Sequence, residues 1–117
     1  MKFVLMRFVV DNFSIIMIQV YVTYPKLSEA RKISELILKK RLAACIDFFP
    51  VTTRYWWHGK MVNGKEIVTF IATQKKHYKA IEILIKKHHS YQVPCILELP
   101  VDRVYKKYLD WIKKEAK

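Results

Sequence analysis

The side chains best suited to bind a soft metal ion are two cysteines, Cys45 and Cys95, and two adjacent histidines, His88 and His89. Thiolate suits Cu(I) and Zn(II), and imidazole suits Zn, Cu and Ni. The chain contains no Cys-x-x-Cys, no His-x-x-x-His and no cluster of carboxylates. Spacing alone therefore specifies no protein-built metal site, and the binding of copper or another divalent metal stays a hypothesis.

The two cysteines stand in different surroundings. Cys45 lies in a run of small and apolar residues, which predicts a buried and slowly reacting thiol. Cys95 follows Pro94 at an expected strand edge, a few residues from His89. If copper binds directly, we expect Cys45 or Cys95 to be the ligand, helped by Met61 or a histidine, because Cu(I) prefers thiolate and thioether to an ammonium group.

His88 and His89 lie at the end of a predicted helix. Neighbouring helical side chains diverge by about 100°, so we expect one imidazole to face inward and the other outward, without sharing a metal ion. The helix dipole favours imidazole at this end, which also gives the pair a purely structural explanation.

A tryptophan pair lies within the sequence Tyr55-Trp56-Trp57-His58-Gly59. On a strand, Trp56 and Trp57 point to opposite faces. One of them can then pack into the core while the other meets a neighbouring subunit. The alternative is a platform on which the bases of a single-stranded nucleic acid stack.

Catalytic motifs are missing from the sequence. It has no recognisable Ser/His/Asp set, no acid–base pair, and only 2 glycines, too few for a glycine-rich phosphate loop. Asp47, Glu66 and Glu98 all fall on expected strands, where each can take part in an interface ion pair. The sequence therefore predicts a protein that is not an enzyme.

A long β-hairpin is the dominant predicted element. Residues 42–57 and 66–73 are rich in β-branched and aromatic residues, and a polar tip with Gly59, Asn63 and Gly64 separates them. At ~3.3 Å per residue the first strand spans about 50 Å. A domain of this length has a radius of gyration near ~13 Å, so the hairpin overhangs its core and predicts an oligomer.

The other elements follow from hydrophobic periodicity. We expect a strand over 17–25, a helix from an N-cap at Ser28 to about residue 40, a helix over 77–88, a strand over 93–99 and a helix over about 102–114. The order β-α-β-β-α-β-α predicts an α+β, ferredoxin-like sandwich with an extra C-terminal helix. The expected inward-facing residues of the last two helices are Tyr78, Ile81, Leu84, Ile85, His88, Val104, Tyr108, Trp111 and Ile112.

Composition allows one cytoplasmic domain. Apolar residues make up 52% of the chain, enough for a core, and no apolar run approaches the ~20 residues of a membrane helix. Two distant cysteines do not make a disulfide framework. The net charge of +12 permits nucleic acid, anionic lipid or acidic ligands as partners but specifies none of them.

Residues 1–16 are predicted to be an extension of a domain that covers residues 17–117. Arg7 and Asp11 interrupt its apolar sequence, which argues against a secretory signal. An upstream start codon chosen in error and a real extra edge strand are the two explanations.

The chain resembles the CutA family, the divalent-cation tolerance proteins, through blocks that match in order and spacing. The resemblance covers residues 17 to about 114. Its principal blocks are Arg41-Leu42-Ala43-Ala44-Cys45, Tyr55-Trp56-Trp57-His58-Gly59-Lys60, Glu66, and His89-Ser90-Tyr91-Gln92-Val93-Pro94.

Membership of this family implies a ferredoxin-like fold, a tight homotrimer, a likeness to PII signalling proteins and a link to tolerance of copper and other divalent metals. Together with the residue chemistry, it points to a ligand cleft between subunits. Around that cleft we expect Tyr55, Trp57, Glu66, His89 and Tyr91. The alternative is that these side chains only seal the interface.

Three positions depart from the family pattern. Asp47 replaces the usual Asn, Ala72 precedes Thr73 where Lys is common, and Cys95 replaces an acidic residue. The missing lysine and carboxylate put a family-wide polar pocket in doubt, whereas Cys95 adds a soft ligand.

A basic module that binds single-stranded RNA is the alternative function, because such modules share this order of elements. Their third strand carries a basic residue, a glycine and spaced aromatics. Residues 65–70 offer only Phe70 among those aromatics, which makes nucleic acid the weaker prediction.

Overall fold

The structure is a computed structural model that describes residues 15–117. The predicted extension, residues 1–16, therefore lies outside the described residues except for Ile15 and Ile16. In the described part of the chain, no helix is long and apolar enough to cross a membrane.

The predicted order of elements is confirmed. Four strands form one sheet in the order β2-β3-β1-β4, and each neighbouring pair is antiparallel. This is the ferredoxin-like arrangement, followed by one more helix. The elements are β1 (Met17–Tyr24), α2 (Leu27–Lys39), β2 (Cys45–Trp57), β3 (Lys60–Gln74), the 3₁₀ helix η1 (Lys75–His77), α3 (Tyr78–His88), β4 (Ile96–Pro100) and α4 (Lys106–Glu115).

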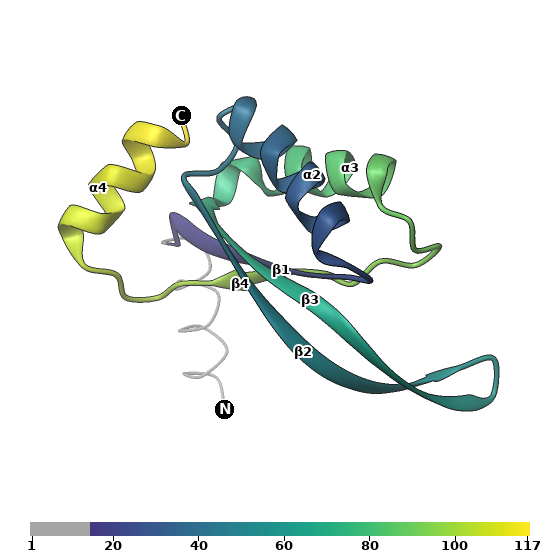
Figure 1. Ribbon diagram of the computed structural model, residues 1–117. Coiled ribbons are helices and arrows are strands. Elements are labelled where there is room, and N and C mark those ends of the chain that lie inside the picture. The colour runs from purple at the N-terminus through teal and green to yellow at the C-terminus, as the bar shows by residue number, and fades with distance from the viewer. Residues whose placement is uncertain (1–14) are drawn as a thin grey trace, which may run out of the picture.

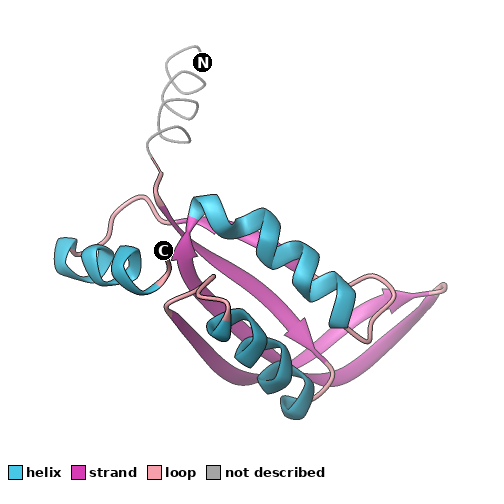
Figure 2. Ribbon diagram, turned by 90° about the horizontal axis from the view of Figure 1, so that it is seen from above, coloured by secondary structure: helices cyan, strands magenta, loops and turns pink. Residues whose placement is uncertain are grey.

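Helices α2 and α3 lie side by side over one face of the sheet (Figures 1 and 2). The alternation of β1 sends every second side chain toward these helices, where apolar residues of α2 and α3 meet them. Each fully buried aliphatic side chain of this size contributes about 1.5–3 kcal/mol. The buried core contains Ile18, Val20, Val22, Tyr24, Ala30, Ile33, Ile37, Ala43, Ile71, Ile81, Leu84 and Ile85.

Among the residues that the structure describes, those on the opposite face of the sheet are covered only at one end. There Ile112 of α4 packs on Met17 and Ala72, which point away from α2 and α3. Further along this face, the ring of Phe70 lies 5.4 Å from that of Phe49 and 5.6 Å from that of Tyr21. We call this side of the sheet the open face.

The hairpin of β2 and β3 extends beyond the two covering helices (Figure 1). The radius of gyration of 15.8 Å exceeds the ~13 Å of a compact domain of this size. The prediction of an overhanging hairpin is therefore confirmed.

The turn of the hairpin contains fewer residues than the predicted polar tip. Trp57 pairs with Lys60, so only His58 and Gly59 form the turn, and Asn63 and Gly64 belong to β3. Both turn residues have positive φ, 50° and 75°, as a two-residue type I′ turn requires. Because this turn matches the strand twist, pairing continues to the end of the hairpin.

Several predicted helix and strand details are wrong. Ser28, the predicted N-cap of the first helix, lies inside α2, whose N-cap is Lys26. The last strand begins at Ile96 instead of residue 93. His88 is exposed, and so are Tyr108 and Trp111, which a helix pattern alone placed inward. For Tyr108 and Trp111 the reason is that α4 contacts only one end of the open face, through Ile112 with Val104 and Leu109.

The two glycines provide a matched test of the turn. Gly59→Ala should lower the free energy of unfolding by about 1 kcal/mol, because an L-residue is strained at positive φ. Gly64→Ala should change it by less than about 0.5 kcal/mol, since its Cβ would stand 3.7 Å from Cγ2 of Thr53, an ordinary contact. The measurement is urea unfolding at one protein concentration. Equal effects of the two substitutions would contradict the assigned turn.

Candidate functional site

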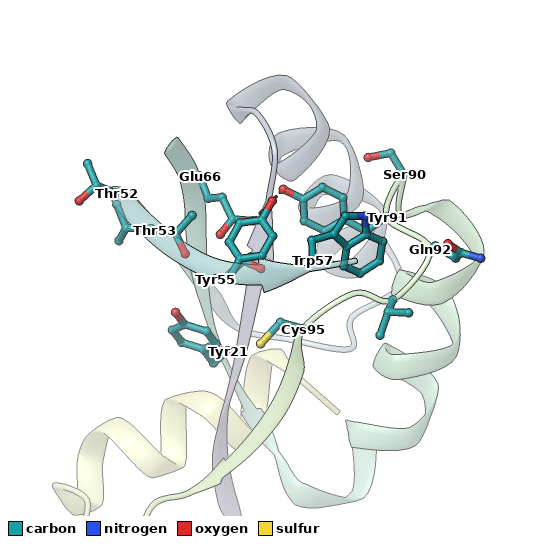
Figure 3. Close-up of a pocket in the computed structure, with 13 residues that line it drawn as sticks. Tyr21, Thr52, Thr53, Tyr55, Trp57, Glu66, Ser90, Tyr91, Gln92 and Cys95 are labelled. Atoms are coloured by element: carbon teal, nitrogen blue, oxygen red, sulfur yellow. Dashed lines mark hydrogen bonds between the residues drawn. The ribbon is translucent and has the colours of Figure 1, made fainter. Parts of the chain in front are cut away.

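A cavity of about 740 Å³ lies between the hairpin, β1 and the segment after α3 (Figure 3). Its volume is typical of ligand sites, which usually combine apolar walls with a few polar groups. Four aromatic side chains line it, those of Tyr21, Tyr55, Trp57 and Tyr91. The polar side chains of the wall are those of Thr23, Thr52, Thr53, Glu66, Ser90, Gln92 and Cys95.

Strand alternation explains how β1 and β2 build two of these walls. Tyr55 and Trp57 are two residues apart, so they point to the same side of β2. Tyr21 and Thr23 of β1 alternate with the core residues and therefore point to the open face. The cavity thus occupies the part of the open face that α4 leaves uncovered.

The hydroxyl of Tyr91 donates a hydrogen bond of 2.7 Å to Oε2 of Glu66 (Figure 3). This contact joins residues of β3 and of the segment after α3. Burial raises the pKa of Tyr91, and the bond to Glu66 and its negative charge raise that pKa further. Tyr91 therefore remains a hydrogen-bond donor at neutral pH.

His89 lies behind the wall instead of lining the cavity. Its buried ring stacks on Tyr24 with ring centroids 4.9 Å apart. The backbone N–H of Tyr91 donates to Nδ1 at 3.0 Å, so the ring proton is on Nε2, which donates to the carbonyl oxygen of Thr23 at 2.7 Å. His89 thus ties the segment that carries Tyr91 to β1.

Glu29 of α2 holds the same segment from the other side. Its Oε2 accepts hydrogen bonds of 3.0 Å from both the backbone N–H and the hydroxyl of Ser90. The same oxygen lies 3.5 Å from Nδ1 of His89. The cavity wall formed by residues 90–95 is therefore anchored to both layers of the fold.

The two cysteines occupy separate places. Cys95 lines the cavity, where burial and the charge of Glu66 raise its pKa. Cys45 begins β2 and is only half-buried in the protomer, in contrast to the buried thiol that the sequence predicts. Its Sγ lies 3.7 Å from Oδ1 of Asp47, and burial followed by the charge of Asp47 raises its pKa. Both thiols are therefore less reactive than free cysteine at neutral pH.

Metal donors do not gather in the described protomer. Within residues 15–117, no group of three or more His, Cys, Asp or Glu side chains could hold a metal ion. Met61, an expected helper of copper binding, pairs with Trp56 next to the hairpin turn. In the cavity only Cys95 and Glu66 are strong candidate ligands.

Sequence reasoning identified part of this arrangement. The structure brings Tyr55, Trp57, Glu66 and Tyr91 to one cavity, whereas His89 supports it from behind. The contribution of Tyr21 was missed, although the alternation of β1 carries the signal for it.

The tryptophan pair divides as predicted between two faces, since Trp57 lines the cavity and Trp56 does not. Trp56 is 69% exposed and Trp57 45% exposed. The expectation that one of them packs into the protomer core is therefore wrong, because the hairpin extends beyond the helices that build that core.

Comparisons with known proteins agree on one family. The sequence profile described as "CutA1 divalent ion tolerance protein" matches residues 18–115. A divalent-cation tolerance protein CutA from Archaeoglobus fulgidus is 38% identical over 80% of this chain and 91% of its own length. One from Pyrococcus horikoshii is 37% identical over 86% of this chain and 99% of its own length.

Solved structures agree with this match. A periplasmic divalent cation tolerance protein CutA from A. fulgidus has a TM-score of 0.85 at 35% identity, covering 86% of this chain and 99% of that one. CutA1 from Oryza sativa has a TM-score of 0.84 at 32% identity, covering 88% and 95%. These names give no support to the RNA-binding alternative.

The adjacent histidines test the anchoring of the cavity wall. His89→Ala should lower the free energy of unfolding by about 3 kcal/mol, because it leaves a void and two backbone groups without partners. The exposed neighbour provides the control, and His88→Ala should change stability by less than about 0.5 kcal/mol. Thermal unfolding at one protein concentration measures both. Wild-type stability of His89→Ala would contradict the anchoring role.

Proposed function

This chain belongs to the CutA1 divalent ion tolerance protein family, and from that premise we propose that it acts in the response to metal ions as a homotrimeric scaffold. In this proposal, the scaffold binds a small ligand or copper at a cleft between subunits and performs no catalysis. The cavity on the open face is the observation that carries the ligand-binding part. Its aromatic walls and few polar groups are what ligand sites usually combine.

The exposed strands support a closed assembly. β2 and β4 are the two edges of the sheet in the described chain, and unpaired edges invite association. The open face also keeps Phe49, Leu97 and Leu99 exposed. A closed three-fold ring that pairs these edges would satisfy the unpaired backbone groups of β2 and β4 and would also bury the exposed apolar side chains of the open face.

The donor set favours a copper site shared between subunits over one built by a single protomer. Cys95 and Glu66 lie at the same cavity, and a structural or catalytic metal usually has three or four protein ligands. A partner subunit that closes the cleft could supply the remaining donors. Cu(I) in particular would select Cys95 over the surrounding hydroxyls.

We also propose a cytosolic location. The cysteines Cys45 and Cys95 are free thiols, which suits a reducing compartment. Location varies among the relatives, since one A. fulgidus structure is described as periplasmic and a rice relative as chloroplastic. Cell fractionation therefore decides this part of the proposal.

Assembly through the open face is tested by two exposed aliphatic residues. Leu97 is 47% exposed on β4 and Ile83 is 59% exposed on the outer side of α3. Leu97→Glu should convert the trimer to smaller species, because it places a charge in the proposed interface. Ile83→Glu should leave the mass unchanged. Sedimentation at micromolar concentration reports both, and a wild-type protein that is a stable monomer would end the proposal of a trimer.

Copper coordination is tested by counting reactive thiols. One equivalent of Cu(I) should protect Cys95 from a chromogenic thiol reagent and leave Cys45 labelled, since Cys95 alone lines the cavity. Protection should persist in Cys45→Ser and disappear in Cys95→Ser. Equal labelling with and without copper would make metal tolerance an indirect function of this protein.

A further inference from the structure

The charge of the cavity is opposite to that of the chain. The sequence has 22 Lys and Arg against 10 Asp and Glu, a net charge of +12. Among the described residues that line the cavity, Glu66 is the only one with a full charge, and none is Lys or Arg. The basic side chains of the described hairpin thus stay out of the cavity lining, and the nearest in sequence, Arg54 and Lys65, line a neighbouring hollow instead.

Within the described part of the chain, the carboxylate of Glu66 has a hydrogen-bond donor but no cationic partner. Oε2 accepts the hydroxyl of Tyr91 at 2.7 Å. Among residues 15–117, the ion pairs of this chain use other carboxylates, and none of them includes Glu66. A partly buried negative charge without a counter-charge is costly, and a bound cation would remove that cost.

The aromatic walls suit the same kind of ligand. Faces of Trp and Tyr attract ammonium groups, and cages of such rings are a known way to recognise organic cations. Tyr21, Tyr55 and Tyr91 lie around the cavity with Trp57, and Figure 3 shows their side chains together with Glu66. An inorganic cation would instead need several strong donors, which this protomer does not bring together in its described part.

We propose that this cavity selects an organic cation, an ammonium group attached to a small apolar body. The inference rests on the proposed ligand-binding function and names its ligand class. Glu66 supplies the counter-charge, Trp57 and the tyrosines supply the aromatic faces, and the hydroxyls of Thr23 and Thr53 are available to accept N–H groups. The cavity volume of about 740 Å³ leaves room for more than the ammonium group alone.

Three probes that share one ring isolate the role of charge: 2-phenylethylammonium, 2-phenylethanol and phenylacetate. Calorimetric titration of the full-length protein at pH 7 should give at least about tenfold tighter binding for the ammonium than for the alcohol. Phenylacetate should bind most weakly. Affinity for the ammonium should fall as salt is added, because salt screens the attraction to Glu66.

Substitutions assign this selectivity to residues. Glu66→Gln keeps an acceptor for Tyr91 but removes the charge, so the ammonium should lose at least about tenfold in affinity while the alcohol is unaffected. Trp57→Leu should weaken the ammonium by a similar factor. Trp56→Leu is the matched control, because Trp56 lies off the cavity, and it should bind like the wild type. Sedimentation of each variant checks that its assembly is intact.

The outcomes separate this inference from the proposed function. Equal binding of ammonium and alcohol, or preference for phenylacetate, would refute the organic cation while leaving a ligand site in place. Unchanged ammonium binding by Glu66→Gln would refute it as well. If an intact assembly binds none of the three probes and no copper, the ligand-binding function fails together with the inference.

Discussion

The difference in length between the central hairpin and the helices that cover it is the constraint on which the rest of the structure depends. A helix of 13 residues such as α2 is about 20 Å long, whereas the 15 residues of β3 span about 50 Å. The helices can therefore cover less than half of the longest strand. The part of β2 that pairs with this uncovered length carries Tyr55 and Trp57, and with them one wall of the cavity.

The cavity is held together by contacts between distant parts of the chain. A buried imidazole fixes the backbone of Tyr91 to β1, and Glu29 fixes Ser90 to α2. Tyr91 then reaches the carboxylate of Glu66 on β3. These hydrogen bonds join the segment 90–95 to β1, α2 and β3. The position of this cavity wall therefore depends on the folded core as well as on the sequence of the segment.

Charge and shape divide the molecule into regions with different uses. Basic side chains lie on the helices and also on the hairpin strands, at Arg54, Lys60 and Lys65, whereas apolar and aromatic side chains such as Phe49, Phe70 and Leu97 lie on the open face. One carboxylate faces the cavity on that side. The chain is thus basic as a whole and belongs to the CutA1 divalent ion tolerance family, whereas Glu66 carries the one full charge among the described residues that line the cavity.

The sequence by itself determined the order of the elements, the long hairpin, the sandwich class and the family, because periodicity and motif spacing are properties of neighbouring residues. It also singled out Tyr55, Trp57, Glu66 and Tyr91. Only the tertiary structure decided that His89 supports the wall while His88 is exposed, that Tyr21 joins the cavity, and that Cys45 and Cys95 lie apart. These outcomes depend on contacts between residues far apart in the chain, and no local pattern encodes which of two equally apolar faces will be covered.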